Sequence, residues 1–151
     1  MKIAIGSDHA GFQLKILLAE HIKGLGHSVE DVGCYDEQPC DYADSAAAVA
    51  REVVAGRAAK GIILCGSGVG ANMAANKIKG ARAGICHDNY SAHQGVEHDD
   101  MNVLVLGARI IGSEVAKELV TSFLGAQFSG VDRHIRRLNK VIALENNFGV
   151  E

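Results

Sequence analysis

Short apolar runs alternate with longer segments of helical periodicity along almost the whole chain. The short runs have strand character and cover residues 2–6, 28–32, 61–65, 81–86 and 101–107. The periodic segments predict helices over 12–23, 42–55, 71–79 and 88–97, from Ser113 onward, and from 132 to about 146. Apolar strands that alternate with helices are typical of a parallel sheet covered on both faces. We therefore predict an α/β protein with a three-layer α/β/α, Rossmann-like fold and a five-stranded parallel sheet.

The periodicity also indicates which helix faces are apolar. In the first helix the recurring apolar residues are Phe12, Ile16, Leu18, Ala19 and Ile22. Ser113 has the residue type of an N-cap, and the apolar face that follows it consists of Val115, Leu119, Val120 and Phe123. The last helix carries basic residues near its start and apolar ones behind them. No internal repeat or linker interrupts the pattern, so we predict one domain over residues 1–151.

Composition and charge narrow the function classes. Hydrophobic residues make up 48% of the 151 residues, with 18 glycines and one proline, which describes a compact protein rather than a disordered one. The formal net charge of −3 gives no general field for nucleic acid or an anionic membrane. No window holds the run of about 18 apolar residues that a membrane span needs, and the first apolar run is too short for a secretory signal. We expect a cytoplasmic protein that acts on a small molecule.

Four cysteines are present: Cys34, Cys40, Cys65 and Cys86. They contain no Cys-x-x-Cys pair, and in a reducing compartment an even count says little about disulfides. We therefore interpret all four as thiols, of which only Cys65 has functional surroundings.

Cys65 ends an apolar run and is followed by glycines at positions 66, 68 and 70 and by a helix-compatible segment. Glycine lets backbone N–H groups approach an anion closely, and a helix N-terminus adds its dipole. A thiol at the head of such a turn is a candidate nucleophile or base. The turn lacks the ending of a P-loop and the spacing of a dinucleotide fingerprint, and Ala71 stands where a cysteine phosphatase needs arginine. A tight turn around an inert buried thiol is the alternative interpretation.

Candidate chemistry follows three of the predicted strands. In parallel α/β sheets ligands bind beyond the carboxyl ends of the strands. Asp8 and His9 follow the first strand, Cys65 ends the third, and Arg109 follows the fifth. Asp8 could instead serve only as an N-cap. The polar loop over 33–41, which leads to Tyr42, is long enough to suggest a role in the site.

Histidines and arginines supply further candidates. His87, His93 and His98 lie in one polar segment, but their spacing gives no helical pair of ligands, so no metal site is predicted. His98, followed by Asp99 and Asp100, is either solvated helix surface or a histidine whose proton a neighbouring carboxylate holds. The candidate phosphate ligands are Arg109, Arg133 and Arg137, since a guanidinium presents paired donors to phosphate oxygens. The last two are four apart and would share a helix face.

Several motifs, in order, resemble the ribose-5-phosphate isomerase type B family. They are Gly6-Ser7-Asp8-His9-Ala10-Gly11, Asp41-Tyr42, Cys65-Gly66-Ser67-Gly68-Val69-Gly70, Ala74-Ala75-Asn76-Lys77, Tyr90-Ser91-Ala92, Asn102-Val103-Leu104 and Arg133-His134. The likeness runs from the first strand to the last helix. The family also includes allose-6-phosphate and galactose-6-phosphate isomerases, so the resemblance leaves the sugar open.

The resemblance implies an isomerase that interconverts ribose 5-phosphate and ribulose 5-phosphate through a cis-enediol, without metal or organic cofactor. By this resemblance Cys65 moves the proton between C2 and C1, while His98 donates a proton that opens the sugar ring. Asp8 handles hydroxyl protons. The loop from Ser67 to Gly70, including Gly68 and Val69, stabilises the enediolate with its N–H groups, next to Gly66. Tyr42 lines the site, and the phosphate ligands correspond to His9, Arg109, Arg133 and Arg137.

The family further implies that two subunits share each site, as a homodimer or tetramer in which the helix over 132–146 contributes to the interface. Asp99 stands where many members have an asparagine that contacts the sugar, which affects the expected substrate preference. Ala43 replaces a common proline, and Ser67 replaces a common threonine. The alternatives to a five-carbon substrate are a six-carbon or another short sugar phosphate. A non-catalytic module that binds sugar phosphates is the rival from another class.

Overall fold

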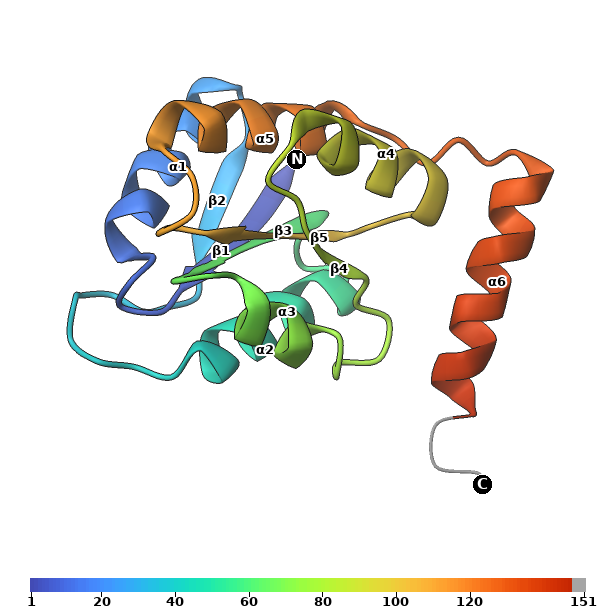
Figure 1. The fold of residues 1–151 in the computed structure, drawn as a ribbon, viewed down its shortest axis with the longest axis horizontal. Helices are drawn as coiled ribbons and strands as arrows, with labels where there is room; N and C mark the ends of the chain where they lie inside the picture. Colours follow the sequence, from blue (N-terminus) through green and yellow to red (C-terminus); the bar gives the residue numbers. More distant parts are fainter. Residues whose placement is uncertain (148–151) are drawn as a thin grey trace.

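The structure, a computed structural model, describes residues 1–147. Within them five strands alternate with five helices, and a sixth helix follows (Figure 1). The strands are β1 Lys2–Ser7, β2 Ser28–Asp31, β3 Lys60–Cys65, β4 Ala83–Ile85 and β5 Val103–Gly107. The helices are α1 Phe12–Gly24, α2 Tyr42–Val54, α3 Val69–Ala75, α4 Asn89–Asp99, α5 Ser113–Gly125 and α6 Asp132–Asn146. All neighbouring strands are parallel, in the order β2-β1-β3-β5-β4, so the predicted α/β class and five-stranded sheet are confirmed.

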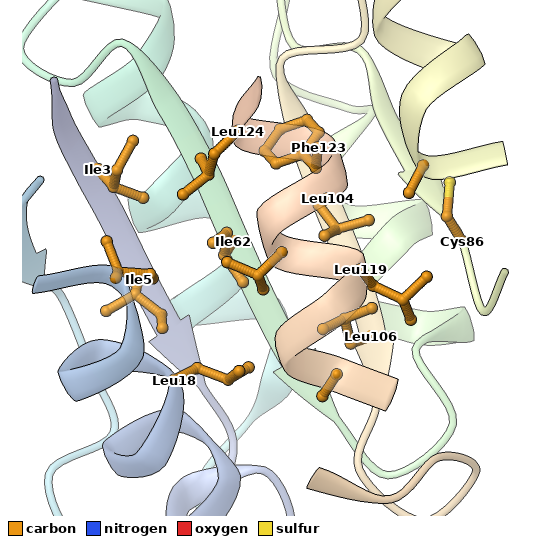
Figure 2. Packing of buried hydrophobic residues seen from close by; sticks show 14 of the residues in the cluster. Ile3, Ile5, Leu18, Ile62, Cys86, Leu104, Leu106, Leu119, Phe123 and Leu124 are labelled. Carbon is orange, nitrogen blue, oxygen red and sulfur yellow. The ribbon is translucent and has the colours of Figure 1, made fainter. Parts of the chain in front are cut away.

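Helices cover both faces of the sheet. In Figure 1, α1, α4 and α5 lie above the sheet and α2 and α3 below it. This division follows from right-handed crossovers, because the chain moves one way along the sheet through α1 and α4 and the other way through α2 and α3. Each face has its own buried cluster. Figure 2 shows residues of the larger one, in which Ile62 and Leu104 of the sheet pack under Leu119 and Phe123 of α5.

The sheet is buried because its strands are apolar on both sides. Ile62 and Leu104 belong to the cluster under α1, α4 and α5, while Ile63 and Val105 belong to the cluster over α2 and α3. This alternation is what a fully covered parallel sheet requires. It leaves the edge formed by the carboxyl ends of the strands as the place for polar chemistry.

Two helix faces differ from the predictions. Ile16 in α1 and Val115 in α5 are exposed, whereas Lys15 and Ala116 are fully buried. The N-cap of α5 is Gly112, and Ser113 is its first helical residue. The predicted apolar faces were therefore correct at their centres. At these two positions the buried residue is the sequence neighbour of the one that was predicted.

The third helix is shorter than predicted, ending at Ala75 rather than at residue 79. The Asn76 side chain explains this, because its amide donates to the carbonyls of Asn72 and Ala83 and accepts from the Ala83 amide. These bonds hold the helix end against the start of β4. That strand accordingly begins at Ala83, two residues later than predicted.

The last helix, α6, stands beside the layered body at the right of Figure 1. Near its start His134 stacks on His98 of α4, and near its end Glu145 accepts a hydrogen bond from the Gly80 amide at 2.7 Å. Between these anchors a groove of about 730 Å³ separates α6 from the body. Apolar side chains of α6 that line the groove or face solvent are Ile135, Leu138, Val141, Ile142 and Leu144. Among the helices of residues 1–147, none has the length and apolar character to cross a membrane.

Candidate active site

The carboxyl ends of β1 and β3 are neighbours and form the base of the site. Ser7 pairs with Leu64 in the sheet, and the Asp8 amide donates to the Leu64 carbonyl at 3.1 Å. From this point the chain turns into α1 above the sheet and into α3 below it. A crevice opens where two adjacent strands send their helices to opposite faces. Asp8 and Cys65 therefore lie at the same switch point, at the strand ends that the sequence predicted for them.

The third predicted strand end lies alongside. Gly107 of β5 pairs with Cys65, and the Ala108 amide donates to the Cys65 carbonyl at 2.8 Å. The Arg109 amide donates to the Gly66 carbonyl at 3.0 Å, and its exposed side chain lies over Gly66. The structure thus brings Arg109 to the glycine turn.

The Cys65 side chain is 4% exposed and has a defined partner. Its sulfur accepts a hydrogen bond from the Gly68 amide at 3.1 Å. Gly68 adopts a φ of 89°, a left-handed conformation that glycine tolerates without strain, and it is the N-cap of α3. The turn therefore sets the direction in which the sulfur points.

Two amides of the predicted anion pocket are already engaged within the turn. Gly68 donates to the Cys65 sulfur, and Val69 donates to the hydroxyl oxygen of the exposed Ser67 at 3.3 Å. An enediolate oxygen that used these N–H groups would have to replace these bonds. The hydroxyl oxygen of Ser67 thus helps to hold the loop in its conformation.

Tyr42 lies directly on the turn from the side of α2. A Cβ atom added to Gly70 would come within 2.5 Å of the Tyr42 ring. Only glycine at this position leaves room for the aromatic ring. Tyr42 is 46% exposed, so its ring covers the loop while one side remains open to solvent.

Asp8 and His9 each accept a hydrogen bond through one side-chain atom. Asp8 is 7% exposed, and its Oδ1 accepts a hydrogen bond from the Gly11 amide at 3.0 Å. The alternative interpretation of Asp8 as an N-cap was wrong, because the N-cap of α1 is Gly11, and the Asp8 carboxylate binds the amide of that residue in the turn before the helix. His9 accepts a hydrogen bond from the Cys40 amide at Nδ1, at 3.3 Å. In the neutral ring this places the proton on Nε2, so that nitrogen is the donor.

The loop over 33–41 is fixed to the site, and here one interpretation from the sequence was wrong. Cys34 and Cys40 form a disulfide, with Cα atoms 6.9 Å apart, rather than two thiols. Cys65 and Cys86 are free. The bridge closes the loop between Ser7, whose carbonyl accepts from the Cys34 amide at 2.7 Å, and His9, which accepts from Cys40.

Lys15 is a residue whose importance sequence reasoning missed. It is fully buried in α1, and its ammonium group donates to Asp31 at 2.7 Å and to the Cys34 carbonyl. A buried charge needs such partners. The signal was available, because Lys15 lies three and seven positions before Leu18 and Ile22 and so falls on the apolar face of the helix.

His98, Asp99, Arg133 and Arg137, here called the α6 group, lie elsewhere in the chain. His98 is near the end of α4, shortly before β5 begins at Val103, which pairs with Gly61. Gly61 lies near the start of β3, and Cys65 lies at the other end of β3. The α6 group therefore sits at the amino edge of the sheet, opposite the carboxyl-edge group of Asp8, His9, Tyr42, residues 65–70 and Arg109. One chain does not bring the two groups together.

His98 of the α6 group stacks its ring on that of His134, with centroids 4.0 Å apart and an interplanar angle of 30°. His134 is 2% exposed and lies 2.6 Å from the Ser129 hydroxyl through Nδ1, while Arg133 donates to its Nε2 at 3.2 Å. Burial lowers the pKa of His134, and the nearby His98, Arg133 and Arg137 act in the same direction. The neutral ring of His134 thus covers one face of the His98 ring.

The partner of His98 differs from the one that the sequence suggested. Its Nδ1 lies 2.8 Å from the side-chain amide of Gln94, one helical turn earlier. Asp100 instead pairs with Arg82 at 2.6 Å. Asp99 is exposed and lines the groove beside α6. The structure therefore gives His98 a neutral amide as its partner, in place of the neighbouring carboxylate that the sequence suggested.

Known proteins give this geometry a context. A family model described as Ribose/Galactose Isomerase matches residues 3–141. The chain is 43% identical over 144 residues to ribose-5-phosphate isomerase B of Escherichia coli (strain K12), covering 95% of this chain and 96% of that protein. It is 41% identical over 133 residues to D-erythrulose-4-phosphate isomerase of Pectobacterium atrosepticum, covering 86% of each. Ribose-5-phosphate isomerase B of Clostridium thermocellum superposes with a TM-score of 0.96 at 40% identity, over 99% of this chain and 100% of that one.

Proposed function

Since this chain belongs to the ribose/galactose isomerase family and is an aldose–ketose isomerase, we propose that it interconverts ribose 5-phosphate and ribulose 5-phosphate. The observation that carries this proposal is the position of the Cys65 sulfur, which the Gly68 amide directs at the end of β3, next to the end of β1 that Asp8 follows. The likeness to ribose-5-phosphate isomerase B of Escherichia coli and of Clostridium thermocellum supports the choice of substrate.

The proposed reaction moves hydrogen within one molecule. Cys65, acting as a base, takes the proton from C2 of the open-chain aldose, and the thiol that forms, whose proton exchanges with solvent, delivers a proton to C1 of the enediol. In the opposite sense a hydroxyl proton leaves O2 and reaches O1, which we assign to the Asp8 oxygen that Gly11 does not occupy. Loop amides from Ser67 to Gly70 stabilise the charge that develops on the enediolate oxygens.

We assign the phosphate and the sugar ring to both groups of residues. His9, with its donor Nε2, and Arg109 bind phosphate from the carboxyl-edge group, and Arg133 and Arg137 bind it from the α6 group. His98 donates the proton that opens the furanose. Because one chain keeps these groups at opposite edges of the sheet, a complete site needs the α6 group of a second subunit.

A twofold homodimer satisfies this requirement, since each chain then supplies one group to each of two equivalent sites. The apolar side chains of α6 that line the groove or remain exposed support a subunit interface at this helix. The unit that we propose is one isomerase domain per chain, over residues 1–151, working as a cytoplasmic enzyme of pentose phosphate metabolism.

A shorter substrate is the second candidate. The similarity to D-erythrulose-4-phosphate isomerase supports a four-carbon sugar phosphate, beside the six-carbon substrates that the family includes. Asp99, in place of a neutral amide, is the residue we expect to influence this choice, since a carboxylate accepts but does not donate hydrogen bonds to sugar hydroxyls. Comparison of kcat/KM across the three chain lengths decides between them.

The test is isomerisation in deuterated water. The purified protein is incubated with ribose 5-phosphate and a chelator, and ribulose 5-phosphate and deuterium at C1 are followed by NMR. Ketose that carries deuterium at C1 supports the proposed proton transfer through an enediol. Binding of ribose 5-phosphate without product or label would instead indicate a non-catalytic binding module.

A further inference from the structure

The imidazole of His98 is held on two sides by residues of its own chain. Its Nδ1 lies 2.8 Å from the Gln94 side-chain amide, and one ring face stacks on His134. Gln94 and His98 are four apart on α4, the spacing at which helix side chains meet. The stacked ring fixes the plane of the imidazole, and the amide fixes its rotation within that plane.

A glutamine suits this position because its amide carries a donor and an acceptor. The NH₂ group donates to an Nδ1 without hydrogen, and after a half-turn of the amide the oxygen accepts from an Nδ1 that bears one. Gln94 can therefore occupy Nδ1 in every protonation state of the ring. The nitrogen left for exchange with a substrate is Nε2.

The charged groups around His98 do not compete for Nδ1. His134 uses its own nitrogens for Ser129 and Arg133, and Glu97 lies 3.6 Å from His93. Arg137 acts on His134 as a positive charge, and Asp99 is exposed at the helix end. The partner of the ring at Nδ1 is thus a neutral side chain.

We propose that Gln94 is a positioning residue that reserves Nε2 of His98 for proton transfer to the sugar ring. The inference rests on the proposed function. During ring opening the O1 hydroxyl loses its proton to the free oxygen of the Asp8 carboxylate, the C1–O4 bond breaks, and O4 receives the proton from Nε2 of the imidazolium. Nδ1 keeps its hydrogen throughout, bound to the Gln94 oxygen.

The chemistry of the two substrates allows a sharp test. Ribose 5-phosphate closes to a furanose and must be opened before isomerisation. Ribulose 5-phosphate cannot close a five-membered ring, because the oxygen on C5 carries the phosphate. Exchange of its C1 hydrogen with deuterated solvent needs the enediol step but no ring opening. The ratio of the two rates isolates the contribution of His98.

Three variants are compared with the wild type. Gln94→Met keeps length and helix propensity but removes both hydrogen-bonding groups. Gln94→Glu retains an acceptor for Nδ1–H. His93→Met, on the same helix and facing Glu97, is the matched control. We expect Gln94→Met to lower kcat for ribose 5-phosphate about tenfold, with KM unchanged and C1 exchange of ribulose 5-phosphate within about twofold. Gln94→Glu should restore most of kcat, and His93→Met should resemble the wild type.

Equal losses of turnover and exchange in Gln94→Met, or no loss in either, would overturn the proposal. Nitrogen-15 NMR of the histidine rings gives a readout that does not depend on turnover. In the wild type Nδ1 of His98 should show one hydrogen-bonded state, which Gln94→Met replaces by a mixture of tautomers. Unchanged ring signals count against the role of Gln94. A wild type without exchange or turnover would show instead that the proposed function fails.

Discussion

The Cys65 sulfur and the Gly68 amide lie 3.1 Å apart, and this contact joins the end of β3 to the start of α3. It sets the sulfur at the strand end while the rest of the glycine turn curves around it. A side chain that is 4% exposed yet directed in this way differs from an inert core thiol, whose surroundings are apolar on all sides.

Replacement of this thiol tests its role directly. We expect Cys65→Ala to lower kcat about a thousandfold, because the base that moves the proton is lost, while sugar phosphate binding and the fold persist. Turnover and binding are measured separately, by NMR and calorimetry. Cys86→Ala is the control, since Cys86 lies in the cluster on the other face of the sheet and burial raises its pKa to about 11. Turnover of Cys65→Ala within tenfold of wild type would contradict the assignment.

The contact of Gly70 with Tyr42 gives a second prediction. In Gly70→Ala the new Cβ would meet the ring at 2.5 Å, so the ring or the loop must shift. We expect a loss of about 1–3 kcal/mol in unfolding free energy and a higher KM. In Gly24→Ala the Cβ enters open space, and stability should not fall. The double variant Gly70→Ala/Tyr42→Ala should recover much of the lost stability in urea unfolding, and failure to recover would show that the ring is not the obstacle.

The residues at the strand ends were predictable because parallel strands finish at one edge of a sheet. Asp8, Cys65 and Arg109 could be placed from the apolar runs alone. The partner of His98 could not, because Asp99 is adjacent in sequence but is exposed beside the groove, while Gln94 is one turn back on the same face. The end of α3 likewise depends on Asn76 reaching Ala83, a contact between elements that no periodicity contains.

Lys15 and the disulfide show another limit of prediction from sequence. A lysine on an apolar face signals a buried partner, but the partners come from Asp31 and the loop carbonyl of Cys34, which only the folded loop brings near. The pairing of Cys34 with Cys40 was missed because a separation of six, without a motif, also suits two thiols.

Reduction of the disulfide should loosen the loop that holds His9. Closing a loop of this length stabilises a protein by about 2 kcal/mol when the main effect of the bridge is to restrict the unfolded chain. With dithiothreitol we expect a lower Tm and a higher KM for the phosphate substrate, with kcat nearly unchanged. Cys34→Ser/Cys40→Ser should behave like reduced wild type and ignore the reductant. A wild type whose Tm and KM do not respond would contradict this function of the bridge.

The stack on His134 predicts a dependence of stability on pH. Burial lowers the pKa of His134 below its ordinary value of 6.5, so below this pH the unfolded chain binds more protons than the folded one. Stability is therefore complete above about pH 6.5 and falls as the pH decreases through the folded pKa. His134→Phe keeps a ring against His98 but does not titrate. Urea unfolding from pH 8 to 5, at one protein concentration, should show a smaller acid loss in His134→Phe, and parallel profiles would exclude the effect.

Subunit mixing tests whether two chains share a site. Cys65→Ala damages the carboxyl-edge group and His98→Gln the α6 group, so each homodimer should be inactive. A mixed dimer contains one intact site and one with both defects. Random pairing makes half of the dimers mixed, so about a quarter of the sites should recover. Asp8→Asn mixed with Cys65→Ala is the control, since both changes lie in the same group and no pairing restores a site. Equal activity of the two mixtures would place the complete site within a single chain, against the separation of His98 from Cys65 across the sheet.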